Sequence, residues 1–189
     1  MGKTKIGLGI CGSYCTYEKL FAVLPSLCEK FDVQPIMTKT AATTDTRFGK
    51  AWEHIERIER VTGKRVLTEI TEVEPLGPNG VIETLLIAPC TGNTLAKLAG
   101  GVTDSAVLMA AKGLLRNGKP VILAPFTNDG LSGSILNIGA LLNRKNVYFV
   151  PIFQDDAENK PNSVASDLSL AEKAVLYAFE GRQLQPVLR

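Results

Sequence analysis

Small polar residues follow an apolar segment near the middle of the chain, and they offer the groups that hold an anion. Thr91, Gly92, Asn93 and Thr94 follow the apolar residues 84–88 after Pro89 and Cys90, and they open a helical pattern. Amides at a helix start have no acceptor within the helix, so they bind phosphate or the polar edge of a ligand. The same residues also fit an ordinary helix cap, with Asn93 or Thr94 accepting from the first turn.

Two further loops have a similar composition. Gly12 and Ser13 follow the first apolar segment, and Thr38 opens a polar stretch after the second. If these segments are neighbouring parallel strands, the loops meet at one edge of a sheet. Converging hydroxyl groups and free amides bind phosphate without a lysine. Three such loops together favour a ligand site over an isolated helix cap.

Three glycines near the N-terminus match the spacing of the dinucleotide-binding fingerprint. They are Gly7, Gly9 and Gly12. That fingerprint also needs an acidic residue at the end of the second strand, about 20 residues further on, to bind the ribose. Here the second apolar segment ends in Thr-Lys-Thr at 38–40. The sequence therefore favours a mononucleotide phosphate over a dinucleotide.

One arginine borders this expected site. Arg47 follows the polar loop after the second apolar segment, and a guanidinium suits bidentate capture of a carboxylate. It is thus a candidate for binding a substrate carboxylate, with a surface position in a first helical turn as the alternative. His54, the only histidine, lies among glutamates and is expected on a solvent-exposed helix face.

The cysteines predict no metal site. Cys11, Cys15, Cys28 and Cys90 lack zinc-binding spacing, and a single histidine adds little to them. Cys11, Cys15 and Cys90 lie near the expected site, where a helix start could activate a thiol. Buried, unreactive thiols are nevertheless expected, reduced as in a cytosolic protein.

Length and composition indicate one globular domain over residues 1–189. The chain is 45% hydrophobic and 21% charged, with a formal net charge of +2. This balance gives no electrostatic footprint for nucleic acid or an anionic membrane surface. No apolar run approaches the roughly 20 residues that a membrane-spanning helix needs. A cytoplasmic protein is expected.

Short apolar segments alternate with helical patterns along the chain. They lack the polar alternation of half-exposed strands, which favours a parallel sheet with helices on both faces and a ligand at the carboxyl ends of its strands. A three-layer α/β/α Rossmann-like fold is therefore expected. Strands are expected at residues 5–10, 33–38, 84–88, 120–125 and 147–150. Helices are expected at residues 17–31, 48 to about 63, 93–99, 105–116, 135–142 and 168–179.

Single residues set the expected bounds of these elements. Pro25 should bend or shorten the first helix, and Pro89 should stop the third strand. Asp45 or Thr46 is expected to cap the second helix and Asp104 the fourth.

The remaining segments are assigned from their composition. Residues 40–46 are expected as a loop and 69–80 as a turn-rich surface excursion. Phe48, Trp52, Ile55 and Ile58 are expected to share one apolar face of the second helix.

The order of these motifs resembles the flavoprotein family, which contains the flavin-dependent cysteine decarboxylases and the flavin prenyltransferases. The residues that carry the resemblance are Gly9-Ile10-Cys11-Gly12-Ser13, Thr38, the run Ala88-Pro89-Cys90-Thr91-Gly92-Asn93-Thr94, and Gly101-Val102-Thr103-Asp104-Ser105. The resemblance implies a Rossmann-like flavoprotein fold and FMN as the cofactor. The implied cofactor site comprises Ser13 and Thr38 at the phosphate, Thr91, Asn93 and Thr94 around the ribityl chain and ring, Thr103, Asp104 and Ser105 at the ring edge, and also Gly12, Gly92 and Pro125.

The resemblance also implies partners. Family members form trimers or dodecamers with the flavin near an interface between protomers, so a homo-oligomer is expected. Within the family the chain is most similar to a branch that acts with a separate second subunit on a small dicarboxylate, in the mother cell of a sporulating bacterium. An oxidoreductase subunit is therefore expected, with a non-catalytic assembly subunit or a flavin prenyltransferase-like enzyme as alternatives. In such a subunit Arg47, with Lys50 or Lys160, would bind the substrate carboxylates.

Two departures from the cysteine decarboxylases argue against that activity. Those enzymes carry a catalytic histidine shortly before the proline-containing motif, whereas residues 73–76 here contain none. Their Pro-x-Met-Asn motif is also absent, and residues 124–128 read Ala-Pro-Phe-Thr-Asn instead.

Overall fold

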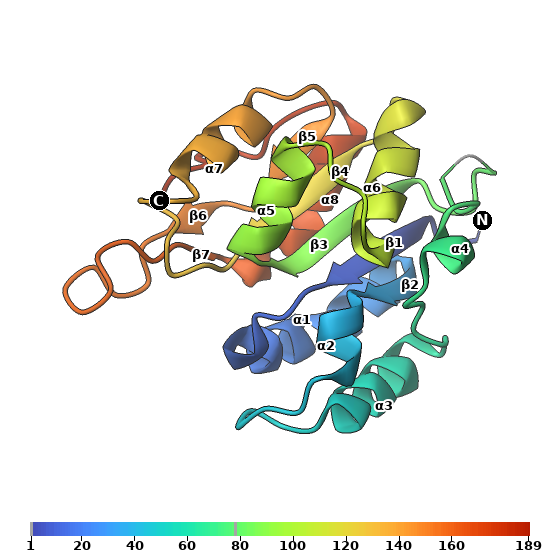
Figure 1. Ribbon diagram of the computed structural model, residues 1–189. Coiled ribbons are helices and arrows are strands. Elements are labelled where there is room, and N and C mark those ends of the chain that lie inside the picture. The colour runs from blue at the N-terminus through green and yellow to red at the C-terminus, as the bar shows by residue number, and fades with distance from the viewer. Residues whose placement is uncertain (1, 78) are drawn as a thin grey trace.

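The protein is built around a five-stranded parallel sheet, seen in the computed structural model, which describes residues 2–77 and 79–189 (Figure 1). The strands are β1 (Lys5–Ile10), β2 (Asp32–Met37), β3 (Thr84–Cys90), β4 (Val121–Pro125) and β5 (Val147–Phe149), in the spatial order β2-β1-β3-β4-β5. All neighbouring pairs are parallel. The expected three-layer α/β fold is confirmed.

Helices cover both faces of the sheet, which explains the apolar, non-alternating strands. Leu86 and Ile122 belong to one buried cluster, whereas their neighbours Leu85 and Leu123 belong to a second cluster on the opposite face. The helices are α1 (Tyr17–Lys30), α2 (Lys39–Thr43), α3 (Ala51–Thr62), α4 (Ile70–Val73), α5 (Gly92–Ala99), α6 (Ala106–Arg116), α7 (Ile135–Leu142) and α8 (Ala171–Phe179). Helices α1 and α8 supply residues to the first cluster, and α5, α6 and α7 supply residues to the second.

Four short elements complete the chain. The 3₁₀ turns Tyr14–Thr16 and Leu168–Leu170 precede α1 and α8, and a small antiparallel pair joins β6 (Ile152–Phe153) to β7 (Ala165–Ser166). None of the helices in the described ranges is long and apolar enough to cross a membrane.

The strand order reverses between β1 and β3, and this places the site. In such open sheets the crevice outside the carboxyl ends of the strands at the reversal point receives the ligand. The loops that meet there are residues 11–13 after β1 and 91–94 after β3.

The first two fingerprint glycines serve packing. A Cβ atom on Gly9 would lie 2.9 Å from Val107 Cγ1 on α6, and one on Gly7 would lie 2.8 Å from Leu85 Cδ1 on β3. Both distances are too short for a real contact, so glycine allows α6 and β3 to approach β1 closely.

Pro89 does not stop the third strand as expected, and Pro25 lies inside the first helix without ending it. Helix α1 continues for 14 residues with Pro25 inside it, and β3 continues through Pro89 to Cys90. The β3–β4 register shifts between Ile87 and Cys90, so the missing amide of Pro89 interrupts no regular ladder. The Pro89 carbonyl accepts from the Cys11 amide at 3.2 Å, which keeps β3 joined to β1.

Three helix caps also differ from expectation, and in α3 Lys50 rather than Asp45 or Thr46 lies at the cap position. Thr91 caps α5, because its hydroxyl accepts from the Thr94 amide. Ser105 caps α6, because its hydroxyl accepts from the Leu108 amide, whereas Asp104 forms an ion pair instead.

Two segments expected to lack structure contain short helices. Residues 39–43 form α2, with the Thr38 hydroxyl as its cap. Residues 70–73 form α4, and the excursion is anchored because Val73 and Leu76 are buried.

The buried face of α3 was expected correctly at Ile58 and wrongly at Phe48 and Trp52. Phe48 and Trp52 are exposed, at 45% and 62%, while Ala51, His54 and Ile58 are buried. The helix begins at Ala51, after a turn in which Asp45 accepts from the Ala51 amide at 3.0 Å. The apolar stripe therefore follows 51, 54 and 58 rather than 48 and 52.

The His54 side chain, on the inner face of this helix, is buried and not, as expected, exposed to solvent. It is 6% exposed and packs edge-on against the Tyr17 ring at 4.9 Å and beside Phe21 at 6.0 Å between ring centroids. Its Nε2 atom has no hydrogen-bond partner within the described residues. Burial lowers the pKa of this imidazole, which favours the neutral form.

Candidate functional site

A groove with two lobes opens at the carboxyl ends of β1 and β3. The first lobe has a volume of about 450 Å³ and the second about 350 Å³, and they share Gly12 and Thr91. The first lobe is lined by Cys11, Gly12, Thr38, Lys39, Thr40, Thr91, Asn93, Thr94, Lys97, Asp104, Ser105 and Leu108. The second is lined by Gly12, Ser13, Tyr14, Cys15, Thr16, Phe48, Thr91, Gly92, Phe126, Thr127, Asn128, Asp155, Lys160, Ser163, Val164 and Ala165.

The start of α5 forms the wall between the lobes. Thr91 Oγ1 accepts from the Thr94 amide at 3.2 Å and lies 3.1 Å from Thr94 Oγ1. The Thr94 hydroxyl in turn donates to Cys11 Sγ at 3.3 Å. The amides of Gly92 and Asn93 have no acceptor among the described residues. They remain available to an anion.

Gly92 is held against a polar cluster on the second-lobe side. A Cβ atom there would lie 2.6 Å from Thr127 Oγ1, 2.9 Å from Asp129 Oδ1 and 2.9 Å from Ser134 Oγ. The hydroxyls of Thr127 and Ser134 both donate to Asp129, and the Thr127 bond contributes most to lowering the pKa of that carboxyl. An ionised carboxylate thus stands beside one side of the helix start, where it suits the dipole.

The first lobe carries more positive than negative charge. Lys97 pairs with Asp104 at 2.6 Å, and Lys39 at the start of α2 makes no ion pair within the described residues. Sequence reasoning missed both lysines, because neither belongs to a recognisable motif. Their only signal is proximity to Thr38 and Thr94 in the chain.

Aromatic rings line the second lobe and were also missed. Tyr14, Phe48 and Phe126 come from three distant segments. The Tyr14 hydroxyl donates to the Thr40 carbonyl at 3.0 Å, which ties the loop after β1 to α2. Only the fold brings these rings together.

Most of the residues expected to bind the cofactor line the groove, and two do not. Gly12, Ser13, Thr38, Thr91, Gly92, Asn93, Thr94, Asp104 and Ser105 line one lobe or both. Thr103 lines a separate cavity beyond the same loop. Pro125 is buried at the end of β4, where its carbonyl accepts from the Ser166 hydroxyl at 3.1 Å.

The other candidates fall around the rim. Arg47 is exposed, with its guanidinium carbon 4.8 Å from the centre of the Phe48 ring, so it stands beside the second lobe without lining it. Lys160 does line that lobe. His54 lines neither lobe.

The thiols differ in exposure. Cys11 and Cys90 are buried as expected, and burial raises the pKa of Cys11 to about 11 and that of Cys90 well above its usual value. Cys15 is exposed, contrary to expectation. Within the described residues, no three histidine, cysteine or acidic side chains gather to hold a metal ion.

Comparisons with known proteins agree with this geometry. A family model described as "Flavoprotein" matches residues 1–158. The B subunit of dipicolinate synthase from Bacillus subtilis (strain 168) is 42% identical over 185 residues, covering 97% of this chain and 92% of the relative.

Solved structures give the same result. The crystal structure of the dipicolinate synthase B subunit from Bacillus halodurans is 40% identical with a TM-score of 0.90, covering 98% of this chain and 96% of that one. The FMN-binding protein AtHal3 shares the fold at 18% identity, with a TM-score of 0.70 over 97% of this chain and all of that one. This chain belongs to the flavoprotein family.

Proposed function

We propose that the protein is the FMN-binding B subunit of a dipicolinate synthase. In this proposal it acts with a separate A subunit to form pyridine-2,6-dicarboxylate from a dihydrodipicolinate-type precursor, in the cytoplasm of the mother cell of a sporulating bacterium. The observation that carries the proposal is the groove at the strand-order reversal, where hydroxyl groups meet two unpaired helix amides. The name of the 42% identical relative supports the reaction.

The donor set around the wall between the two lobes suits a flavin phosphate. The free amides of Gly92 and Asn93 point from a helix start, and Lys39 adds a positive charge nearby. Asp129 places a negative charge on the second-lobe side of Gly92, so the Asn93 side is the favourable one for an anion. Ser13 and Thr38 add hydroxyl groups on the two neighbouring loops.

The rest of the cofactor would be held by the shared wall and the two lobes. Thr91, Asn93 and Thr94 would contact the ribityl chain and ring, with Asp104 and Ser105 at the ring edge. The Cys11 thiol, neutral because it is buried, offers a soft uncharged wall rather than a second anion. Thr103 lines another cavity, so its side chain would not contact the cofactor. It would contribute only by helping to set the course of the loop that carries Asp104 and Ser105.

Forming the aromatic ring removes two electrons and two protons from a dihydropyridine, and bound FMN supplies a two-electron acceptor. The chain itself would bind the two carboxylates of the substrate. Arg47 and Lys160 flank the second lobe and make no ion pair within the described residues. Lys50 is unsuited because Asp45 already pairs with it at 3.0 Å.

Flavin binding is tested on the chain as purified. We expect a yellow protein whose spectrum and released ligand mass match FMN. Asn93→Asp places a negative charge at the helix start beside the proposed cofactor and should weaken FMN retention at least about tenfold. Asn143→Asp, an exposed change at the end of α7, is the matched control.

Three outcomes separate the alternatives. A colourless chain that fails to retain FMN after reconstitution, alone and with its A subunit, would favour a non-catalytic assembly role. A released flavin heavier than FMN by a prenyl group would favour a flavin prenyltransferase-like enzyme. Unchanged pyridine-2,6-dicarboxylate formation by an Arg47→Ala, Lys160→Ala variant would remove these two residues from substrate binding.

A further inference from the structure

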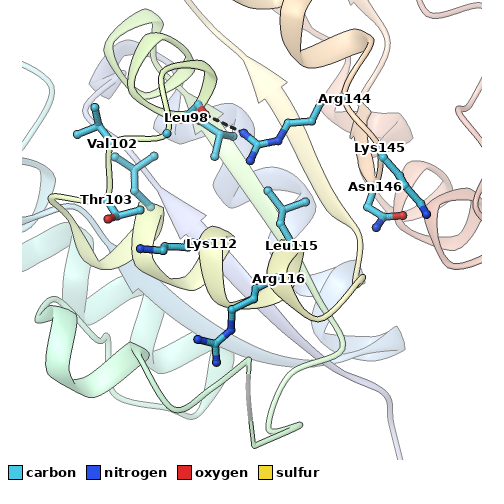
Figure 2. Close-up of a pocket in the computed structure, with 11 residues that line it drawn as sticks. Leu98, Val102, Thr103, Lys112, Leu115, Arg116, Arg144, Lys145 and Asn146 are labelled. Atoms are coloured by element: carbon cyan, nitrogen blue, oxygen red, sulfur yellow. Dashed lines mark hydrogen bonds between the residues drawn. The ribbon is translucent and has the colours of Figure 1, made fainter.

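A second cavity of about 470 Å³ lies on the other side of the α5–α6 loop from the groove (Figure 2). Its walls come from this loop, from α6 and from the turn between α7 and β5. It shares only Leu108 with the groove. The lining residues that the argument uses are Leu98, Val102, Leu115, Lys112, Arg116, Arg144 and Lys145.

The floor of this cavity is apolar. Leu98 and Leu108 are buried at its base, and Leu115 is partly buried between them and the mouth. Val102 is 43% exposed at the edge, so an apolar surface is open to solvent there. Cavities of this size with an apolar floor and a few polar groups are typical of small-ligand sites.

The rim is positively charged. Lys112 and Arg116 lie one turn apart on α6, and Arg144 and Lys145 stand on the turn before β5. None of the four makes an ion pair within the described residues, and no carboxylate lines the cavity. In Figure 2, Arg144 reaches across the cavity above Leu115 toward Leu98, whereas the charged ends of Lys112, Arg116 and Lys145 point outward at its edges. Like charges gathered without a partner repel one another, and an anion would relieve that repulsion.

Arg144, one of the two cations on the turn, is held in place. Arg144 Nη1 donates to the Leu98 carbonyl at 2.9 Å, drawn dashed in Figure 2, which leaves the rest of the guanidinium to a ligand. The backbone around it is also fixed, because the Arg144 amide donates to Leu141 and the Val147 amide donates to Arg144. Asn146 closes the turn with a φ of 62° and accepts from the Val121 amide.

We propose that this cavity is a second binding site, for a small ligand that joins an apolar body to two or more negative charges. The leucine floor takes the apolar body, and Lys112, Arg144 and Lys145 take the charges through charge-assisted hydrogen bonds. An aromatic dicarboxylate and a nucleoside diphosphate both have this chemistry. The proposal does not rest on flavin binding, because this cavity and the groove share only Leu108 among their lining residues.

The test measures binding of two probes, pyridine-2,6-dicarboxylate and ADP, to the full chain by calorimetry and by methyl NMR. The methyl groups of Leu98, Val102 and Leu115 line this cavity and not the groove, so they report the place of binding. We expect at least one probe to shift these methyl signals, and which one does identifies the source of the ligand.

Variants decide whether the charges are responsible. A Lys112→Gln, Lys145→Gln double variant should weaken binding roughly tenfold or more, since two charge-assisted contacts are removed. Both side chains are exposed and make no side-chain hydrogen bond within the described residues, so folding should be retained. Arg144→Gln should weaken binding as well. Lys30→Gln, an exposed cation at the end of α1, should leave binding unchanged.

Two results would overturn the proposal. The first is that neither probe shifts the Leu98, Val102 and Leu115 signals. The second is that binding at these methyl groups keeps its affinity in both the lysine double variant and Arg144→Gln. Both results are read at methyl groups outside the groove, so they can be interpreted even if FMN does not bind there.

Discussion

The Thr94 hydroxyl donates to the Sγ atom of Cys11 at 3.3 Å, joining the start of α5 to the loop after β1 where the strand order reverses. Both side chains are buried. The hydrogen bond favours the thiolate, but burial acts more strongly in the opposite direction and raises the pKa of Cys11 to about 11. The wall of the groove at this point is therefore uncharged at neutral pH.

Thiol alkylation checks this charge state. With iodoacetamide at pH 8, we expect the exposed Cys15 to react at least about tenfold faster than Cys11 or Cys90, because only a thiolate reacts and burial disfavours it. Peptide mass spectrometry over a time course measures the rates. Equal rates for Cys11 and Cys15 in the folded protein would show that Cys11 is accessible and activated.

The close approach at the start of α5 predicts an unusual sensitivity at Gly92. Gly92→Ala should lower the free energy of unfolding by about 1–3 kcal/mol, because the new methyl group meets Thr127, Asp129 and Ser134 at 2.6–2.9 Å. It should also weaken FMN retention, since the amide at this position moves. Denaturant unfolding and flavin absorbance measure the two effects.

Gly139 on α7 supplies the control for that substitution. Nothing lies within 4 Å of a Cβ atom there, and the residue is exposed in a helix. Gly139→Ala should be neutral or stabilising by roughly 0.5–1 kcal/mol, as expected for alanine in a helix. A Gly92→Ala variant as stable as Gly139→Ala would mean that the polar cluster relaxes freely.

The strands and long helices could be predicted from the sequence because each has a pattern of its own. Continuous apolar runs marked all five sheet strands, and the helix over residues 135–142 has the expected bounds. Local rules failed where tertiary contacts decided the outcome. Pro89 stays in β3 because the β3–β4 register shifts at this point, so the missing amide breaks no regular ladder. Helix α3 buries His54 because it begins at Ala51 and not at Phe48, which changes the residues on its buried face.

The candidate site was predictable in part for the same reason. The hydroxyl and glycine residues around Thr91 lie in short loops directly after strands, so the edge of the sheet collects them. Phe126, Lys160 and Tyr14 reach the groove from segments with no shared motif. Their convergence depends on packing that no single segment encodes.

Because Ser105 and not Asp104 caps α6, substitutions at these two adjacent residues should affect stability differently. Ser105→Ala should cost about 1 kcal/mol of unfolding free energy, because the Leu108 amide loses its acceptor. Asp104→Ala should cost less than about 1 kcal/mol, because it breaks only an exposed pair with Lys97. Salt distinguishes them: in about 1 M NaCl, where the Debye length is roughly 3 Å, the Asp104 effect should vanish and the Ser105 effect persist. If Asp104→Ala is the costlier change at high salt, Asp104 is the true cap.

His54 makes stability depend on pH in a direction that can be worked out. Burial lowers the pKa of His54 in the folded protein below the roughly 6.5 expected in the unfolded chain. As pH falls through this window the unfolded state binds a proton that the folded state does not, so stability is full above about 6.5 and declines below it. His54 is the only histidine, so no other imidazole contributes.

His54→Leu tests this directly. The leucine keeps an apolar side chain between Tyr17 and Phe21 and removes the Nε2 atom that lacks a partner. Urea unfolding at a series of pH values from 7.5 to about 5 should give a falling free energy for the wild type and a flatter line for the variant. Matching slopes would place the pH dependence on carboxylates instead. A steeper decline in the variant would contradict the lowered pKa of His54, because removing a group that resists protonation can only reduce the loss.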